Sequence, residues 1–229
     1  MELSKRLEAI GALVTQAKSV ADIGTDHGYL PIWLIKNKRC DKVIAMDINN
    51  GPLMRAKQHV EAYHLQERIE TRLSDGLLEL EAGEVQGIII AGMGGGLMIK
   101  ILSTSPFVVE SLNECILQPQ SEIEKVRQYL WENNLRVEAE NMVEEEGKYY
   151  PMMRVVQGED EKYSAVELKY GRCLINTQNT TLKKFLQKER REKEDLLDTL
   201  SLHQGTNITK RQKEIARELE QIKEALGRM

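Results

Sequence analysis

The chain has 229 residues, 41% of them hydrophobic and 30% charged, and its formal net charge is −4. This globular composition excludes a disordered chain, a collagen-like chain and a disulfide scaffold. No apolar run approaches the ~20 residues of a membrane span, and the N-terminal segment lacks the apolar stretch of a signal peptide. The three cysteines form no CxxC pair, so we expect free thiols, no metal, no membrane segment and a cytoplasmic location.

Residues 1–160 alternate short apolar runs with helix-like stretches, which is typical of an open α/β sheet. The apolar runs are nearly continuous, as expected of parallel strands buried on both faces. The predicted strands are 19–23, 42–48, 68–73, 87–92 and 114–119. The predicted helices are Tyr29–Asn37, Gly51–Tyr63, Gly95–Leu102 and Ser121–Asn133. Ser121 and Glu124 have the spacing of a capping box at the start of the last helix.

The pattern changes after the last of these helices. Residues 135–157 predict two strands joined through EEEGKYYP, and antiparallel strands are common at the edge of a parallel sheet. A further strand is predicted at 162–171.

The last ~55 residues have no strand pattern and predict a helical hairpin. The segment HQGTN at 203–207 is expected to separate its two helices, with Gly205 ending the first and Thr206 or Asn207 capping the second. The apolar positions are Leu182, Phe185, Leu186, Leu196, Leu197 and Leu200 in the first helix, and Ile215, Leu219, Ile222 and Leu226 in the second. We therefore expect two domains, a sheet domain at 1–160 and a hairpin at 161–229.

The charge is unevenly distributed between these parts. Residues 1–177 hold 20 Lys and Arg against 27 Asp and Glu, whereas residues 178–229 hold 12 against 9. A basic appendage on an acidic body is compatible with a polyanionic partner. A solvated helical face of mixed charge is the simpler explanation of so small an excess.

The strongest local motif is VADIGTDHGYL at 20–30, where a strand, a glycine turn and a helix follow one another. Such a turn is expected to expose backbone N–H groups and to let a ligand approach closely. The dinucleotide fingerprint GxGxxG is absent, and Asp22, Gly24 and Gly28 stand in its place. A strand-end carboxylate favours a cationic ligand, so the motif indicates S-adenosylmethionine rather than NAD. A tight turn without a ligand is the alternative.

Three further motifs follow the next strands. Asp47 ends its strand as a ribose-binding acid would, although such a residue also caps helices. Asp75 in SDGL is placed to accept from an adenine amino group, or it belongs to a plain turn. The glycine-rich AGMGGG at 91–96 brings backbone close to a ligand, or it serves as a hinge. A Pro-rich NPPY-type loop is missing here, which makes an exocyclic amine a less favoured acceptor.

With these motifs in this order along the chain, the sequence resembles a bacterial family that makes 1-methyladenosine at tRNA position 22 with S-adenosylmethionine. The resemblance covers essentially the whole chain and rests on VADIGTDHGYLP, INNGPLMRAK, SDGL, IIIAGMGGG, ILQPQ and EEEGKYYP, with the opening LSKRL. It implies a Rossmann-like class I methyltransferase sheet with a coiled-coil-like hairpin, and tRNA as the partner. Asp47 departs from the family, which more often has Glu there, but the shorter carboxylate has the same role.

The residues expected to form the cofactor pocket are the strand-end acids and the glycine turns. They are Asp22, Gly24, Gly28, Asp47, Ile48, Asp75, Gly76, Gly92 and Met93.

The catalytic candidates lie in the first turn. Asp26 is expected to accept from the adenine N6 amino group, and His27 either to hydrogen-bond the base or to cap the helix. Tyr29 is expected to stack on the base, or to be a half-buried first-turn residue. Met93 and the segment Tyr149-Tyr150-Pro151 are candidates for the wall of the base pocket. The alternative for Tyr149 and Tyr150 is a place in the core at a sheet edge. The candidate phosphate contacts are Lys5, Arg6, Lys183, Lys184, Lys188, Arg190 and Arg191.

Two other functions remain open from the sequence. The acidic body slightly favours a methyltransferase of a small molecule or a protein. A non-catalytic RNA-binding module would have lost the cofactor carboxylates, which are present here. We expect a monomer.

Overall fold

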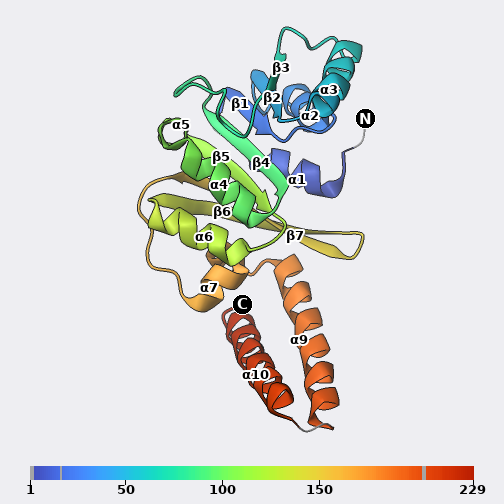
Figure 1. Cartoon of the computed structure of the whole chain (residues 1–229), viewed down its shortest axis with the longest axis vertical. Helices are drawn as coiled ribbons and strands as arrows, with labels where there is room; N and C mark the ends of the chain where they lie inside the picture. Colours follow the sequence, from blue (N-terminus) through green and yellow to red (C-terminus); the bar gives the residue numbers. More distant parts are fainter. Residues whose placement is uncertain (1–2, 16, 203–204) are drawn as a thin grey trace. The chain divides into compact units, whose positions relative to one another are not determined.

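The computed structural model describes residues 3–15, 17–202 and 205–229, and the chain divides into two compact units, Met1–Lys162 and Tyr163–Met229. The first unit holds a seven-stranded sheet in the order β3-β2-β1-β4-β5-β7-β6 (Figure 1). Strands β1 to β5 pair in parallel, and β7 and β6 add antiparallel pairs at one edge, which confirms the predicted fold class. The strands are β1 Ser19–Ile23, β2 Lys42–Asp47, β3 Ile69–Leu73, β4 Gly87–Met93, β5 Glu114–Pro119, β6 Leu135–Glu145 and β7 Lys148–Gln157.

Helices of the first unit form two groups, in which α1 and α3 contact α2, while α5 and α6 contact α4. They are α1 Lys5–Leu13, α2 Tyr29–Lys36, α3 Asn50–Ala62, α4 Gly95–Thr104, α5 Pro106–Glu110 and α6 Ile123–Glu132. Helix α1 was not predicted from its own pattern. Its start is fixed by Ser4, whose side chain accepts from the Leu7 N–H, as an N-cap residue does.

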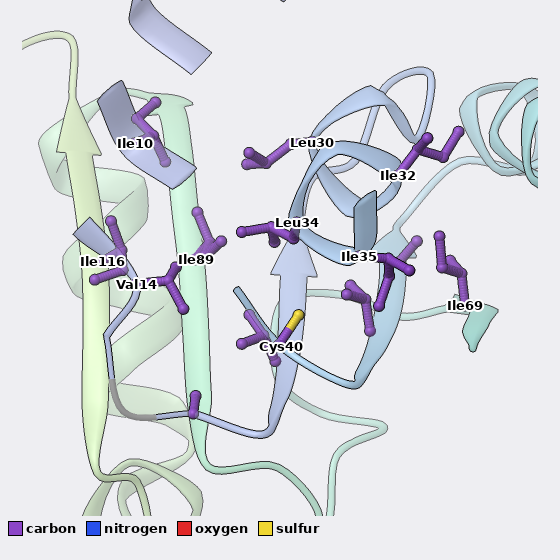
Figure 2. Packing of buried hydrophobic residues seen from close by; sticks show 14 of the residues in the cluster. Ile10, Val14, Leu30, Ile32, Leu34, Ile35, Cys40, Ile69, Ile89 and Ile116 are labelled. Atoms are coloured by element: carbon purple, nitrogen blue, oxygen red, sulfur yellow. The ribbon is translucent and has the colours of Figure 1, made fainter. Parts of the chain in front are cut away.

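The core next to the first helix group joins segments that are far apart in sequence. Ile10 of α1 and Leu34 of α2 lie over Ile89 of β4 and Ile116 of β5 (Figure 2), and all four are at most 1% exposed. This packing fixes α1 and α2 on the sheet, and with them the loop that follows β1.

Two local predictions of secondary structure were wrong. The predicted strand 162–171 is instead helix α7, Ala165–Tyr170, because Ser164 and Glu167 form a capping box that starts a helix. The predicted capping box of Ser121 and Glu124 does not form. Helix α6 starts after Glu122, which has a left-handed φ of 51°, and no side chain caps it.

In the second unit, α7 and α8 (Arg172–Asn176) precede two long helices, α9 Thr180–Ser201 and α10 Thr206–Gly227, which lie side by side (Figure 1). The buried residues of these helices are Leu182 and Leu186 on α9 and Ile215, Leu219, Ile222 and Ala225 on α10. Leu196, predicted for the packed face, is 41% exposed.

The predicted caps of the hairpin turn were also wrong. Gly205 does not end α9, since it is the N-cap of α10 with a φ of 151°. Thr206 and Asn207 lie in the first turn of α10, and α9 ends at Ser201 with Leu202 as its C-cap. Residues 203–204 of the predicted break lie outside the described residues.

A carboxylate ties together three segments of the second unit. Glu167 accepts from the Arg228 guanidinium at 2.7 Å, from the Ser164 N–H at 2.8 Å and from Arg172 at 3.4 Å. Burial alone would raise its pKa, but these hydrogen bonds outweigh that effect and lower the pKa of Glu167 to about 2.

Glu167 therefore stabilises the folded unit at neutral pH and loses this contribution when protonated. Because the folded pKa lies below the ordinary value of 4.5, the contribution is complete above pH 4.5 and is lost as the pH falls towards 2. We expect Glu167→Gln to lower the melting temperature at pH 7. At pH 3 the melting temperatures of the variant and the wild type should lie closer together. Circular dichroism melts test this, with the exposed Glu220→Gln as the matched control; an unchanged difference at both pH values would contradict it.

Within the described ranges, no helix is long and apolar enough to cross a membrane, and no group of three or more His, Cys, Asp or Glu is arranged to hold a metal ion.

Candidate active site

The candidate site lies at the carboxyl ends of the parallel strands. β1 pairs with β2 on one side and with β4 on the other, so the strand order reverses at β1, and ligands of open α/β sheets bind at such a point. A cavity of about 310 Å³ opens there. Its lining includes Arg6, Asp22, Gly24, Tyr29, Gly92 and Gln120.

A second cavity, of about 480 Å³, is larger but lies at the other end of the sheet. Ser19 and Lys42, which start β1 and β2, line it together with Glu84. It contains none of the predicted site residues and faces the amino ends of the strands, where α/β sheets do not place their ligands.

The turn after β1 needs glycine at two positions. Gly24 and Gly28 have φ values of +79° and +70°, which L side chains rarely adopt. A Cβ on Gly24 would lie 2.3 Å from Cε of Met93, so Met93 packs directly on this turn. The N–H groups of Gly24 and Thr25 both donate to the Met46 carbonyl, at 2.8 and 2.9 Å. The N–H groups of Gly24 and Thr25 are therefore not available to a ligand, and for these two positions the expectation of exposed N–H groups was wrong.

Asp22 is a buried carboxylate in the wall of this cavity. It is 6% exposed, and among the described residues no Lys, Arg or His forms an ion pair with it. Burial raises the pKa of Asp22 to about 6, the nearby Thr25 hydroxyl opposes the shift, and the charge of Asp47 adds to it. A buried acid without a cation is destabilised when ionised, so this site favours a positively charged ligand.

The ends of β2 and β3 bring the next predicted residues together. The Asp47 carboxylate accepts from the Asn49 N–H at 2.7 Å, and the Asp47 carbonyl accepts from the Ser74 N–H at 2.9 Å. Ile48, which follows β2, is 58% exposed, and Asp75, which follows β3, is also exposed. Gly76 has a φ of +60°, and a Cβ there would lie 3.1 Å from Ile101 of α4, which keeps the SDGL turn close to that helix.

The end of β4 is held from the side of α1. Gln118 of β5 is fully buried, and its Oε1 accepts from Arg6 Nη1 at 2.9 Å and from the Gly92 N–H at 3.2 Å. The Arg6 guanidinium also lies 5.6 Å from the centre of the Tyr150 ring. Arg6, predicted as a phosphate contact, thus lies in the cavity wall and ties α1 to the glycine-rich loop.

The catalytic candidates of the first turn contact helix α3. The Asp26 carboxylate accepts from Arg55 Nη2 at 2.8 Å and lies 3.3 Å from His27 Nε2. Tyr29, 37% exposed, stacks on His27 and on His59, with ring centres 5.3 and 4.8 Å apart. His59 Nδ1 lies 2.8 Å from the His27 carbonyl oxygen, so this nitrogen carries the proton and donates it.

Sequence reasoning missed Arg55, His59 and Gln118. Arg55 and His59 are four residues apart on a predicted helix, so they share one face, and that spacing was available in the sequence. The role of Gln118 depends on α1 packing beside β5, which no local pattern indicates.

The remaining phosphate candidates lie mostly on the surface. Lys5 is exposed, and its backbone N–H donates to Glu145. On α9, Lys183, Lys184, Lys188 and Arg191 are exposed. A surface hollow of about 370 Å³ follows α9 and is lined by Lys184, Gln187, Lys188, Arg191, Glu192 and Asp195. Arg190 is half-buried and lies 3.6 Å from Glu194, so it is less accessible than its neighbours.

Comparison with known proteins agrees with this site. The family model for a methyltransferase domain matches residues 3–153, which include every element that lines the cavity. The fold is therefore that of a methyltransferase domain.

Individual relatives narrow this class. The chain is 31% identical to the tRNA (adenine(22)-N(1))-methyltransferase of Bacillus subtilis (strain 168) over 99% of its own length and 98% of the relative. The crystal structure of the B. subtilis M1A22 tRNA methyltransferase TrmK covers 98% of this chain and 99% of its own, with 29% identity and a TM-score of 0.84. Sp1610 of Streptococcus pneumoniae, solved with S-adenosyl-L-methionine, has 32% identity and a TM-score of 0.86 and covers 98% of this chain and 100% of its own. This chain belongs to the tRNA (adenine(22)-N(1))-methyltransferase family.

Proposed function

We propose that this protein transfers the methyl group of S-adenosylmethionine to N1 of adenine 22 in tRNA, giving 1-methyladenosine. The observation that carries the proposal is the match over 99% of the chain to a tRNA (adenine(22)-N(1))-methyltransferase, in a fold whose cavity wall contains the buried carboxylate of Asp22.

The residues at the strand ends suit the cofactor. When bound, S-adenosylmethionine supplies a methyl group activated by the positive sulfur. Asp22 would hold its positively charged amino acid end, because that charge compensates the buried carboxylate. Asp47 and Asp75 would accept from the ribose and from the adenine amino group of the cofactor. Gly24 and Gly92 give the turns their positive φ values at the edge of the cavity, and Met93 and Ile48 would supply apolar contacts to the cofactor.

The reaction requires the protein mainly to orient its substrate. Adenine N1 is a nucleophile once the base is unpaired, so no strong base is needed, and the base must first leave the tRNA stack. Tyr29, whose ring is partly exposed at the cavity, would stack on the flipped base. Arg55 pairs with Asp26, and His59 donates to the His27 carbonyl in the loop beside it. We assign Asp26 to ordering that loop because its carboxylate accepts from Arg55 and lies beside His27.

The direct test is incubation of the purified protein with an unmodified tRNA transcript and labelled S-adenosylmethionine, followed by digestion to nucleosides and mass analysis. The proposal predicts labelled 1-methyladenosine. Label in another nucleoside, or in protein alone, would contradict it.

The exposed basic residues of α9 are proposed to contact tRNA phosphates. Replacing Lys183, Lys184 and Lys188 together by glutamine is expected to weaken tRNA binding roughly tenfold at low salt. The salt dependence of binding should also decrease, because a complex with fewer phosphate contacts releases fewer counterions when it forms. Filter binding across salt concentrations measures this, and the affinity for S-adenosylmethionine should not change. The matched control neutralises Lys210, Lys213 and Lys223, which are exposed on α10. Equal losses in both variants would contradict a specific role for α9.

A tRNA substrate also leads us to propose a cytoplasmic location, and we propose a monomer as the working form. Light scattering at assay concentration tests the second point, for which a mass near 26.2 kDa is expected.

A further inference from the structure

Two glutamines near the end of β5 differ in burial, since Gln118 lies in the strand and is buried, whereas Gln120 directly follows the strand and is exposed. The amide of Gln118 is fully buried, and both its oxygen and its nitrogen form hydrogen bonds. Its oxygen accepts from Arg6 and from the Gly92 N–H, and its Nε2 donates to the Pro119 carbonyl at 3.1 Å. Gln118 therefore helps to build the wall of the cavity, and its buried amide is not accessible to a ligand.

Gln120 faces the cavity itself. Gln120 is exposed, and it lines the same cavity as Asp22, Gly24 and Tyr29. Its backbone N–H donates to the Met93 carbonyl at 2.8 Å, which fixes the start of the side chain. Within the part of the chain that the structure describes, its amide forms no hydrogen bond. The wall of the cavity thus carries an amide whose acceptor and two donors are available to a ligand.

Two other polar side chains of the cavity, Asp26 and Arg6, already have partners. Asp26 is paired with Arg55 and lies beside His27, and Arg6 donates to Gln118. The site therefore offers Gln120, rather than Asp26, for hydrogen bonds with a base.

The chemistry of adenine fits this amide. A glutamine binds adenine through two parallel hydrogen bonds, accepting from N6 and donating to N7. This contact leaves N1 free to take up a methyl group. Guanine presents two acceptors, O6 and N7, on the same edge, so the amide oxygen would face an acceptor. We propose that Gln120 reads the N6/N7 edge of the target adenine and so selects the base that is methylated.

This inference rests on the proposed function and is tested with a modified substrate. The substrates are two ligated tRNAs that carry either adenine or 7-deazaadenine at position 22, and the enzymes are the wild type and Gln120→Met. Two good hydrogen bonds to a base correspond to roughly 5- to 150-fold in discrimination. We expect Gln120→Met to lower kcat/KM on adenine at least fivefold, and 7-deazaadenine to lower that of the wild type. The variant should show no further loss with 7-deazaadenine, because the contact to N7 is already missing.

Controls separate this from other causes. Gln128→Met, an exposed glutamine on α6, should behave as the wild type, and calorimetry should give unchanged S-adenosylmethionine affinity for Gln120→Met. Full activity of Gln120→Met, or the same loss with 7-deazaadenine in the variant and the wild type, would overturn the assignment. Absence of transfer by the wild type to either tRNA would instead overturn the proposed function, and this assignment with it.

Discussion

Replacement of Arg127 by methionine is expected to destabilise the first unit by about 3–5 kcal/mol. The Arg127 guanidinium donates to Glu140 at 2.8 and 2.9 Å, and both side chains are only 1% exposed. Removal of the arginine would leave the carboxylate of Glu140 buried without its cation, which costs more free energy than the intact pair contributes. Denaturation followed by tryptophan fluorescence measures the effect, since both tryptophans, Trp33 and Trp131, lie in the first unit.

The control for this prediction is a similar pair on the surface. Arg136 and Glu138 lie 3.5 Å apart with side chains 46% and 37% exposed, so Arg136→Met should cost less than about 1 kcal/mol. The double variant Arg127→Met/Glu140→Leu should regain most of the lost stability, because apolar residues often replace a buried ion pair without loss. Similar small effects of Arg127→Met and Arg136→Met would contradict the account.

Replacement of Asp22 by asparagine is expected to weaken S-adenosylmethionine binding roughly 10- to 100-fold, because the variant keeps the shape of the side chain but loses the charge that would pair with the ligand. Isothermal titration measures the loss. Asp41→Asn is the matched control, since Asp41 precedes β2 at the opposite end of the sheet and is 76% exposed. Equal affinities of Asp22→Asn and the wild type for S-adenosylmethionine would contradict a role of Asp22 in binding the cofactor.

The same residue predicts a dependence on pH. In the free protein burial raises the pKa of Asp22 to about 6, so protonation below pH 6 removes the charge that attracts the ligand. The affinity of the wild type should therefore fall as the pH drops from 7 to 5, by up to tenfold for each pH unit below 6. Asp22→Asn should show no such fall over this range, and parallel curves would contradict the prediction.

The parallel strands could be predicted closely from the sequence because they are buried on both faces and therefore apolar throughout. β1 and β5 have the predicted bounds. Residues 162–171 misled the prediction because Val166, Leu168 and Tyr170 alternate as in a strand. The local hydrogen bonds between Ser164 and Glu167 nevertheless start a helix there.

The candidate site was only partly predictable, for a similar reason. Residues at the carboxyl end of a strand, such as Asp22 and Asp47, could be placed because parallel strands end at one edge of the sheet. Contacts between elements could not be placed. The pairing of Asp26 with Arg55 depends on how α3 packs beside the first loop, and the position of Arg6 depends on α1.

The most direct test of the central claim maps the methylated nucleotide. Unmodified tRNA is treated with the protein and S-adenosylmethionine, and reverse transcription is then used to locate the block that a methyl group on N1 imposes. The account predicts a single block at position 22 and none in a transcript with adenine 22 replaced by guanine. A block elsewhere, or one that persists in the replaced transcript, would contradict it.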